Sequence, residues 1–89
     1  MVKLNKHFGG GICQVSTTIY NAALEIDGLI IVEHHDHGQK VPYIEEGKDA
    51  TVSYNAYDLK FKNNLQESIK IYVSTDENYV TSRIVKLTN

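Results

Sequence analysis

The sequence predicts an α+β fold in which one N-terminal helix packs on a mostly antiparallel β-sheet that ends in a C-terminal β-meander. Three observations support this class: apolar residues at helical spacing follow a glycine run, a β-branched run comes next, and strand-like segments fill the last third of the chain. Because 89 residues build one hydrophobic core but rarely two, we expect a single domain over residues 1–89. Its abrupt start indicates a piece of a longer chain.

The helix is expected from about residue 12 to residue 27. After Gly9-Gly10-Gly11, apolar residues recur with the period of a helix, at Ile12, Val15, Ile19, Ala22, Ala23 and Ile26. Gly28 follows at the point where a helix commonly ends on a left-handed residue. The apolar stripe is expected to face the sheet.

Strands are expected at five places. Residues 29–33 are β-branched without polar alternation, which predicts a strand buried on both faces. Residues 51–54 form a short strand, and residues 57–62 alternate as a half-buried strand does. Residues 68–74 and 79–87 are joined by a turn.

Composition excludes several classes of partner. With 42% hydrophobic and 22% charged residues, the chain has the make-up of a soluble globular domain. A net charge of -2 provides no basic field for nucleic acid. No apolar run approaches the roughly 20 residues of a membrane helix, so we expect no membrane contact by this segment. A single cysteine cannot form an intramolecular disulfide and leaves a free thiol.

That thiol, Cys13, is predicted to lie at the helix N-terminus. Free amides and the positive end of the helix dipole lower the pKa of a thiol placed there. Substrate contacts are expected from Gly10 and Gly11, which let a carbonyl approach the backbone, and from Gln14 and Tyr43. The alternative interpretation of Cys13 is a small hydrophobic residue packed under the glycine turn.

A base and an orienting acid follow in the chain. His37, or else His35, lies just past the predicted strand, and Asp49 or Asp58 lies on the next segments. The order of cysteine, histidine and aspartate is similar to that of papain-like and transglutaminase-like enzymes, an analogy of layout in which Cys13 would attack an amide carbonyl.

Two other interpretations of the histidine cluster stay open. His34 and Asp36 fit a solvated polar loop. His35 and His37 would project to one side of an extended strand, where a metal could take Cys13 as its third ligand. Without a second close-spaced ligand pair this signal is weak, so we expect no metal and no cofactor.

The residues from Gly9 to Ala23 resemble the signature of the VanW family, and the resemblance continues through Glu33, His35, His37, Val41, Tyr43, Gly47, residues 49–54 and residues 58–63. It implies a bacterial, extracytoplasmic cell-envelope protein, in longer chains joined to a membrane anchor and wall-associated domains. The chain departs from the family pattern at His34 and Gly38, where relatives tend to have arginine and serine.

Together these observations predict a cell-envelope domain with a Cys-His-Asp site for acyl transfer or hydrolysis on peptidoglycan-type peptides. The expected ligand is a cell-wall peptide or glycan. A non-catalytic binding or structural module is the alternative function, and a Cys/His metal site is the third. The sequence indicates neither the bond attacked nor the oligomeric state.

Overall fold

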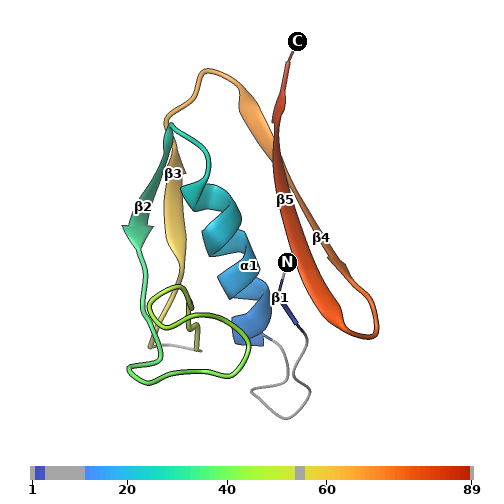
Figure 1. Cartoon of the computed structure of the whole chain (residues 1–89). Helices are drawn as coiled ribbons and strands as arrows, with labels where there is room; N and C mark the ends of the chain where they lie inside the picture. Colours follow the sequence, from blue (N-terminus) through green and yellow to red (C-terminus); the bar gives the residue numbers. More distant parts are fainter. Residues whose placement is uncertain (1, 4–11, 54–55, 89) are drawn as a thin grey trace.

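The computed structural model describes residues 2–3, 12–53 and 56–88, and its strands form two antiparallel sheets with the helix between them (Figure 1). One sheet has the strand order β1-β5-β4 and the other pairs β2 with β3. The α+β class is confirmed, but the helix lies between two sheets rather than on one. The elements are β1 (Val2–Lys3), α1 (Ile12–Leu24), β2 (Leu29–Glu33), β3 (Lys60–Asn63), β4 (Ser68–Thr75) and β5 (Tyr79–Leu87).

Helix α1 begins at Ile12 as predicted and ends at Leu24, earlier than expected. Beyond Leu24 the chain continues in turns with hydrogen bonds of the 3₁₀ type, in which the amides of Glu25 and Ile26 donate to carbonyls three residues back. Gly28 has a φ of 98°, and a Cβ there would lie 2.5 Å from the Leu65 side chain. Gly28 therefore has the left-handed conformation that was predicted, but it lies in the turn before β2 and not at the end of α1, and close packing against Leu65 adds a second reason for glycine there.

Strand β2 has the predicted bounds, but the prediction of burial on both faces is wrong. Leu29 is buried, whereas Ile30 and Val32 are 49% and 64% exposed. The reason is that α1 covers one face of the two-stranded sheet. The hairpin of β4 and β5 lies where it was predicted, with antiparallel pairs from Ser68↔Leu87 to Thr75↔Val80.

The segment before β3 is less regular than predicted. Strand β3 starts at Lys60 rather than residue 57, and the strand expected at residues 51–54 is reduced to one bridge between Ser53 and Tyr57. Tyr54 lies outside the described residues. The backbone here finds other partners: the Thr51 amide donates to the His35 carbonyl, and carbonyls on either side accept from α1 side chains.

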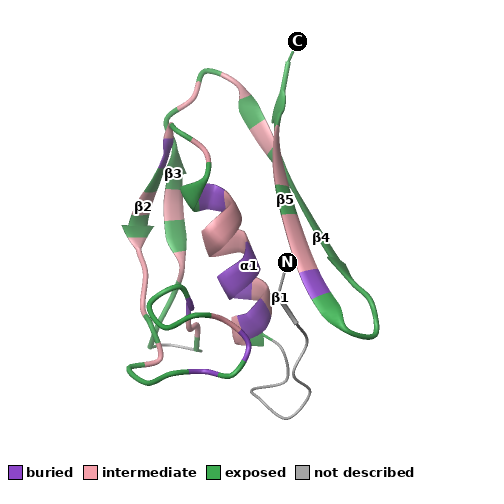
Figure 2. Cartoon of the chain, in the orientation of Figure 1, coloured by how far each residue is buried: buried purple, intermediate pink, exposed green. Residues whose placement is uncertain are grey.

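The core is small, and the buried face of α1 is largely polar (Figure 2). The expectation that the apolar stripe faces the core is wrong for Ile12, which is 64% exposed, while Val15 and Ile19 are only half-buried. Irregular chain packs on the first half of the helix, and its backbone groups need hydrogen-bonding partners. The buried polar helix residues are Gln14, Ser16, Thr17 and Thr18.

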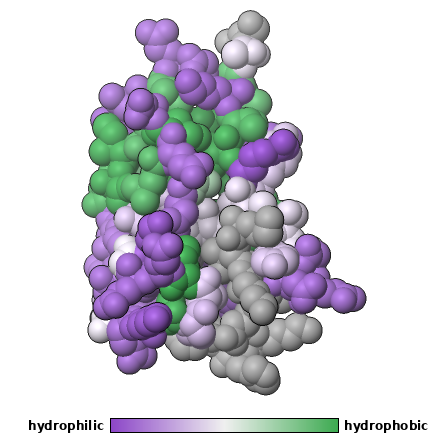
Figure 3. Space-filling view, viewed as in Figure 1, coloured by the Kyte–Doolittle hydropathy of each residue, from purple (hydrophilic) through white to green (hydrophobic). Residues whose placement is uncertain are grey.

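Apolar and polar side chains are separated along the molecule. Figure 3 shows apolar surface gathered in the upper half of the view, over the sheets and the end of α1, and mostly hydrophilic surface over the loops below. Within the described residues, no helix has the length and apolar character needed to cross a membrane.

Candidate functional site

The structure brings together Cys13 at the start of α1, His37 in the loop after β2, and Asp49 in the following segment. Oδ2 of Asp49 accepts hydrogen bonds from Nδ1 of His37 at 2.5 Å and from its backbone amide at 2.7 Å. The His37 imidazole also lies close enough to the Cys13 thiol for each group to shift the pKa of the other. Because Asp49 occupies Nδ1, Nε2 is the nitrogen left for the thiol.

The thiol has two further contacts on the segment that follows Asp49. Its Sγ lies 3.4 Å from Oγ1 of Thr51 and 3.6 Å from the carbonyl oxygen of Val52. Cys13 is partly buried. The sulfur therefore has polar neighbours, and the alternative of a cysteine packed among apolar groups does not describe its surroundings.

The electrostatics shift the pKa values of Cys13, His37 and Asp49 toward their charged forms. Burial raises the pKa of Cys13, but hydrogen bonds with Thr51, the Val52 backbone and His37 outweigh it and hold the pKa below its ordinary value. Burial lowers the pKa of His37. Its interactions with Asp49 and Cys13 outweigh this effect and raise the pKa above its ordinary value. Burial raises the pKa of Asp49, but the bonds from His37 bring it below the ordinary value.

Polar side chains of α1 hold the Asp49 segment in place, and we call these contacts the helix clamp. The Ala50 carbonyl accepts from Oγ of Ser16 at 2.5 Å, and the Ala50 amide donates to Oγ1 of Thr17 at 3.0 Å. Nδ2 of Asn21 donates to the Lys48 carbonyl at 2.8 Å. These bonds fix the backbone on both sides of Asp49.

The hydroxyls of Ser16, Thr17 and Thr18 bond within the helix or to the Asp49 segment. Sequence reasoning missed Asn21, whose only signal was its place one helical turn beyond Thr17. It also took His34 for a solvated residue, which is wrong. Nε2 of His34 donates to the Asp49 carbonyl at 2.7 Å, and its ring stacks on Tyr20 at 4.0 Å.

The other candidates for base and acid are engaged elsewhere. Nε2 of His35 bonds Oε2 of Glu33 at 2.9 Å, and its ring packs against Tyr57. The Asp58 carboxylate accepts from the Leu59 amide. The structure thus brings His37 and Asp49 to the thiol, rather than His35 and Asp58.

The predicted substrate contacts are placed less favourably. Gly10 and Gly11 lie outside the described residues. Gln14 is fully buried, and Tyr43 is 8% exposed with its ring edge-on to His37 and its hydroxyl near Thr17. Burial raises the pKa of Tyr43. Both side chains are therefore buried rather than exposed to a ligand, and Tyr43 contacts His37.

For the metal interpretation, the described part of the chain contains no group of three histidine, cysteine or acidic residues that could hold a metal ion. His35, one of the three ligands that interpretation needs, is instead bonded to Glu33.

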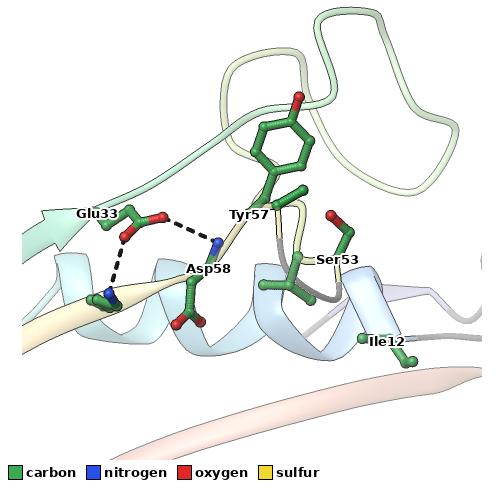
Figure 4. A pocket seen from close by; sticks show the side chains of 8 residues that line it. Ile12, Glu33, Ser53, Tyr57 and Asp58 are labelled. Carbon is green, nitrogen blue, oxygen red and sulfur yellow. Dashed lines mark hydrogen bonds and ion pairs between the residues drawn. The ribbon is translucent and has the colours of Figure 1, made fainter.

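Two open pockets lie beside residues that contact the thiol, and Tyr57 lines both, whereas Cys13 itself lines neither. The Ile12 pocket, of about 650 Å³, is lined by Ile12, Glu33, Val52, Ser53, Ala56, Tyr57, Asp58 and Lys60 (Figure 4). The His37 pocket, of about 500 Å³, is lined by His34, His35, Asp36, His37, Gly38, Thr51 and Tyr57.

The fold and site together define a small α+β domain with a cysteine, a histidine and an aspartate joined at a helix N-terminus. The family described as VanW like protein matches residues 2–85, so the chain belongs to this family. It is 45% identical over 69 residues to the uncharacterized protein YoaR of Bacillus subtilis (strain 168), which covers 78% of this chain. The chain spans only 22% of the length of that curated relative. No solved structure matches it.

Proposed function

We propose that this domain is a cysteine-dependent enzyme that hydrolyses or transfers the acyl group of amide bonds in peptidoglycan-type peptides. The observation that carries the proposal is the contact of Cys13 with His37 and of His37 with Asp49, in which the pKa of the thiol is lowered and that of the imidazole is raised. In this proposal Cys13 is the nucleophile, His37 the base and acid, and Asp49 the residue that orients His37.

The reaction would proceed in two balanced steps. The Cys13 thiolate attacks the carbonyl carbon and forms a carbon–sulfur bond. When the carbon–nitrogen bond breaks, the amine leaves with the proton of the His37 imidazolium. A water molecule or a second amine then attacks the thioester, His37 takes its proton, and the sulfur leaves to restore the ion pair.

The helix N-terminus offers stabilisation for the oxyanion formed in both steps. Helix α1 begins at Ile12, and the first amides of a helix have no acceptor within it. The amide of Cys13 is among them and lies beside the attacking sulfur. Aligned amides and the positive end of the helix dipole favour negative charge at this point.

The choice of substrate rests on the family. Membership of the VanW like family, together with the envelope setting that the resemblance implies, supports peptides of the cell wall as the ligand and an extracytoplasmic location. Stem peptides and crosslinks contain the amide bonds that a cysteine nucleophile attacks.

The first test measures the rate of alkylation by iodoacetamide against pH. Cys13 is the only cysteine, so the whole signal comes from the site. We expect a midpoint well below the roughly 8.5 of an ordinary thiol, and a midpoint near that value when the protein is unfolded in urea. Substitution His37→Asn should raise the midpoint of the folded protein. Equal midpoints in the folded and unfolded protein would contradict the proposal.

The second test separates catalysis from binding. The full-length protein is incubated with a digest of peptidoglycan, and released amines are identified by mass spectrometry. We expect release by the wild type and none by Cys13→Ala, with the far-ultraviolet circular dichroism unchanged. If both proteins bind the digest and neither releases an amine, the domain is a binding module instead.

A further inference from the structure

We propose that the substrate amide lies across the boundary of the two pockets, with its acyl side in the Ile12 pocket and its leaving amine in the His37 pocket. The residue on the acyl side would carry an uncharged, apolar side chain. This inference rests on the proposed function. It adds the direction in which the substrate lies across the site and the kind of side chain on its acyl side.

The sulfur contacts one residue of each pocket, although Cys13 itself lines neither. Thr51, whose hydroxyl is 3.4 Å from Sγ, lines the His37 pocket. Its neighbour Val52, whose carbonyl oxygen is 3.6 Å from Sγ, lines the Ile12 pocket. An extended ligand that presents a carbonyl carbon to Cys13 would therefore place one half in each pocket.

The direction follows from the path of the proton. The leaving amine must receive a proton, and the imidazolium that donates it is His37. Of the two pockets, His37 lines only the one named for it. The amine half of the substrate must therefore lie in the His37 pocket, which leaves the acyl half to the Ile12 pocket.

The lining of the Ile12 pocket determines which acyl side chain fits. Ile12 is 64% exposed and Tyr57 is 49% exposed, so both offer apolar surface that a ligand can cover. Figure 4 shows Glu33 turned toward the backbone amide of Asp58, and its other oxygen lies 3.4 Å from Nζ of Lys60. Glu33 and Lys60 form an ion pair, so the Asp58 carboxylate gives the pocket a net negative charge. This charge disfavours an acidic ligand.

The test compares two probes of similar size that differ in charge. Chloromethyl ketones of N-acetyl-leucine and N-acetyl-aspartate alkylate a thiol and place their side chain on the acyl side. Each rate is measured by mass spectrometry and divided by the iodoacetamide rate of the same protein. For the wild type, we expect the leucine probe to react faster by about 30-fold, the size of discrimination that an apolar pocket supplies.

Two matched variants locate the preference. Ile12→Ser should reduce the ratio between the probes to about 3-fold or less, because it removes apolar surface from the pocket. Ile30→Ser alters an isoleucine that is 49% exposed on β2 and lines neither pocket, so it should keep the wild-type ratio.

The possible failures are distinguishable. If iodoacetamide reacts with the folded protein no faster than with the unfolded one, the proposed function fails. If iodoacetamide reacts fast but the two probes react equally, the function stands and the pocket assignment is wrong. A preference that survives in Ile12→Ser, or that Ile30→Ser removes equally, also overturns the assignment.

Discussion

The β4–β5 hairpin and the segment of residues 34–53 are held in different ways, although the segment also buries Val41, Tyr43 and Ala50. The hairpin is a regular ladder in which most side chains of β4 are exposed. The segment carries His37 and Asp49, and its described contacts are largely single bonds between a side chain and a backbone group. Because the hydrogen bonds of the ladder come from the backbone, substitutions of exposed side chains in the hairpin should cost far less than substitutions in the segment.

The largest effect is expected for Asp49→Asn. The Asp49 side chain is 3% exposed and accepts two hydrogen bonds from His37, so the change replaces the buried, charged acceptor of both bonds with a neutral amide. We expect the free energy of unfolding to fall by about 3 kcal/mol. Urea denaturation measures this loss. The control Asp27→Asn, at an exposed turn, should cost less than about 0.5 kcal/mol. Equal losses would mean that the carboxylate does not hold the segment.

Thr17→Val should have the next largest effect. The change keeps the shape of the side chain but removes the hydroxyl that accepts from the Ala50 amide, and a buried amide without a partner costs about 2 kcal/mol. Thr88→Val, at an exposed position after β5, is the matched control. A loss at Thr17 no greater than at Thr88 would show that the helix clamp contributes nothing to stability.

The contribution of Asp49 should depend on pH, with a smaller effect than either substitution. The pKa of Asp49 is lowered on folding, so its contribution is present above about pH 4 and is lost as pH falls through the folded value. The pKa of His37 is raised, so its contribution is present below about pH 6.5 and is lost as pH rises through the folded value. The stability difference between Cys13→Ser and the double variant with Asp49→Asn should be largest between these limits.

Urea denaturation of both proteins at pH 2.5, 5.5 and 9 measures this difference, and the Cys13→Ser background removes the thiolate from the comparison. A difference that stays constant across the three pH values would contradict the charged pair.

The smallest effect is expected in the hairpin. Val73 is 44% exposed on β4, so Val73→Thr should change the free energy of unfolding by less than about 0.5 kcal/mol. Val80, at the start of β5, is fully buried, and Val80→Thr should cost about 1.5 kcal/mol because it buries a hydroxyl. Thermal unfolding of the two variants compares them. If Val73→Thr cost as much as Thr17→Val, the contrast between ladder and clamp would be lost.

Much of the candidate site was accessible to sequence reasoning. The glycine run and the apolar spacing placed Cys13 at a helix start, and the order of polar residues pointed to His37 and Asp49. Spacing could not choose between His35 and His37, because the choice depends on which imidazole finds Glu33 and which finds Asp49. The catalytic roles of these residues remain predictions.

The sequence by itself determined where the helix begins, which glycine before β2 is left-handed, and where the two C-terminal strands lie, because backbone preferences and apolar periodicity act over a few neighbouring residues. Only the tertiary structure decided that α1 lies between two sheets and buries a polar face. The Ser16–Ala50 and Cys13–Thr51 contacts join residues more than 30 positions apart. Such pairings arise from packing, which local patterns do not encode.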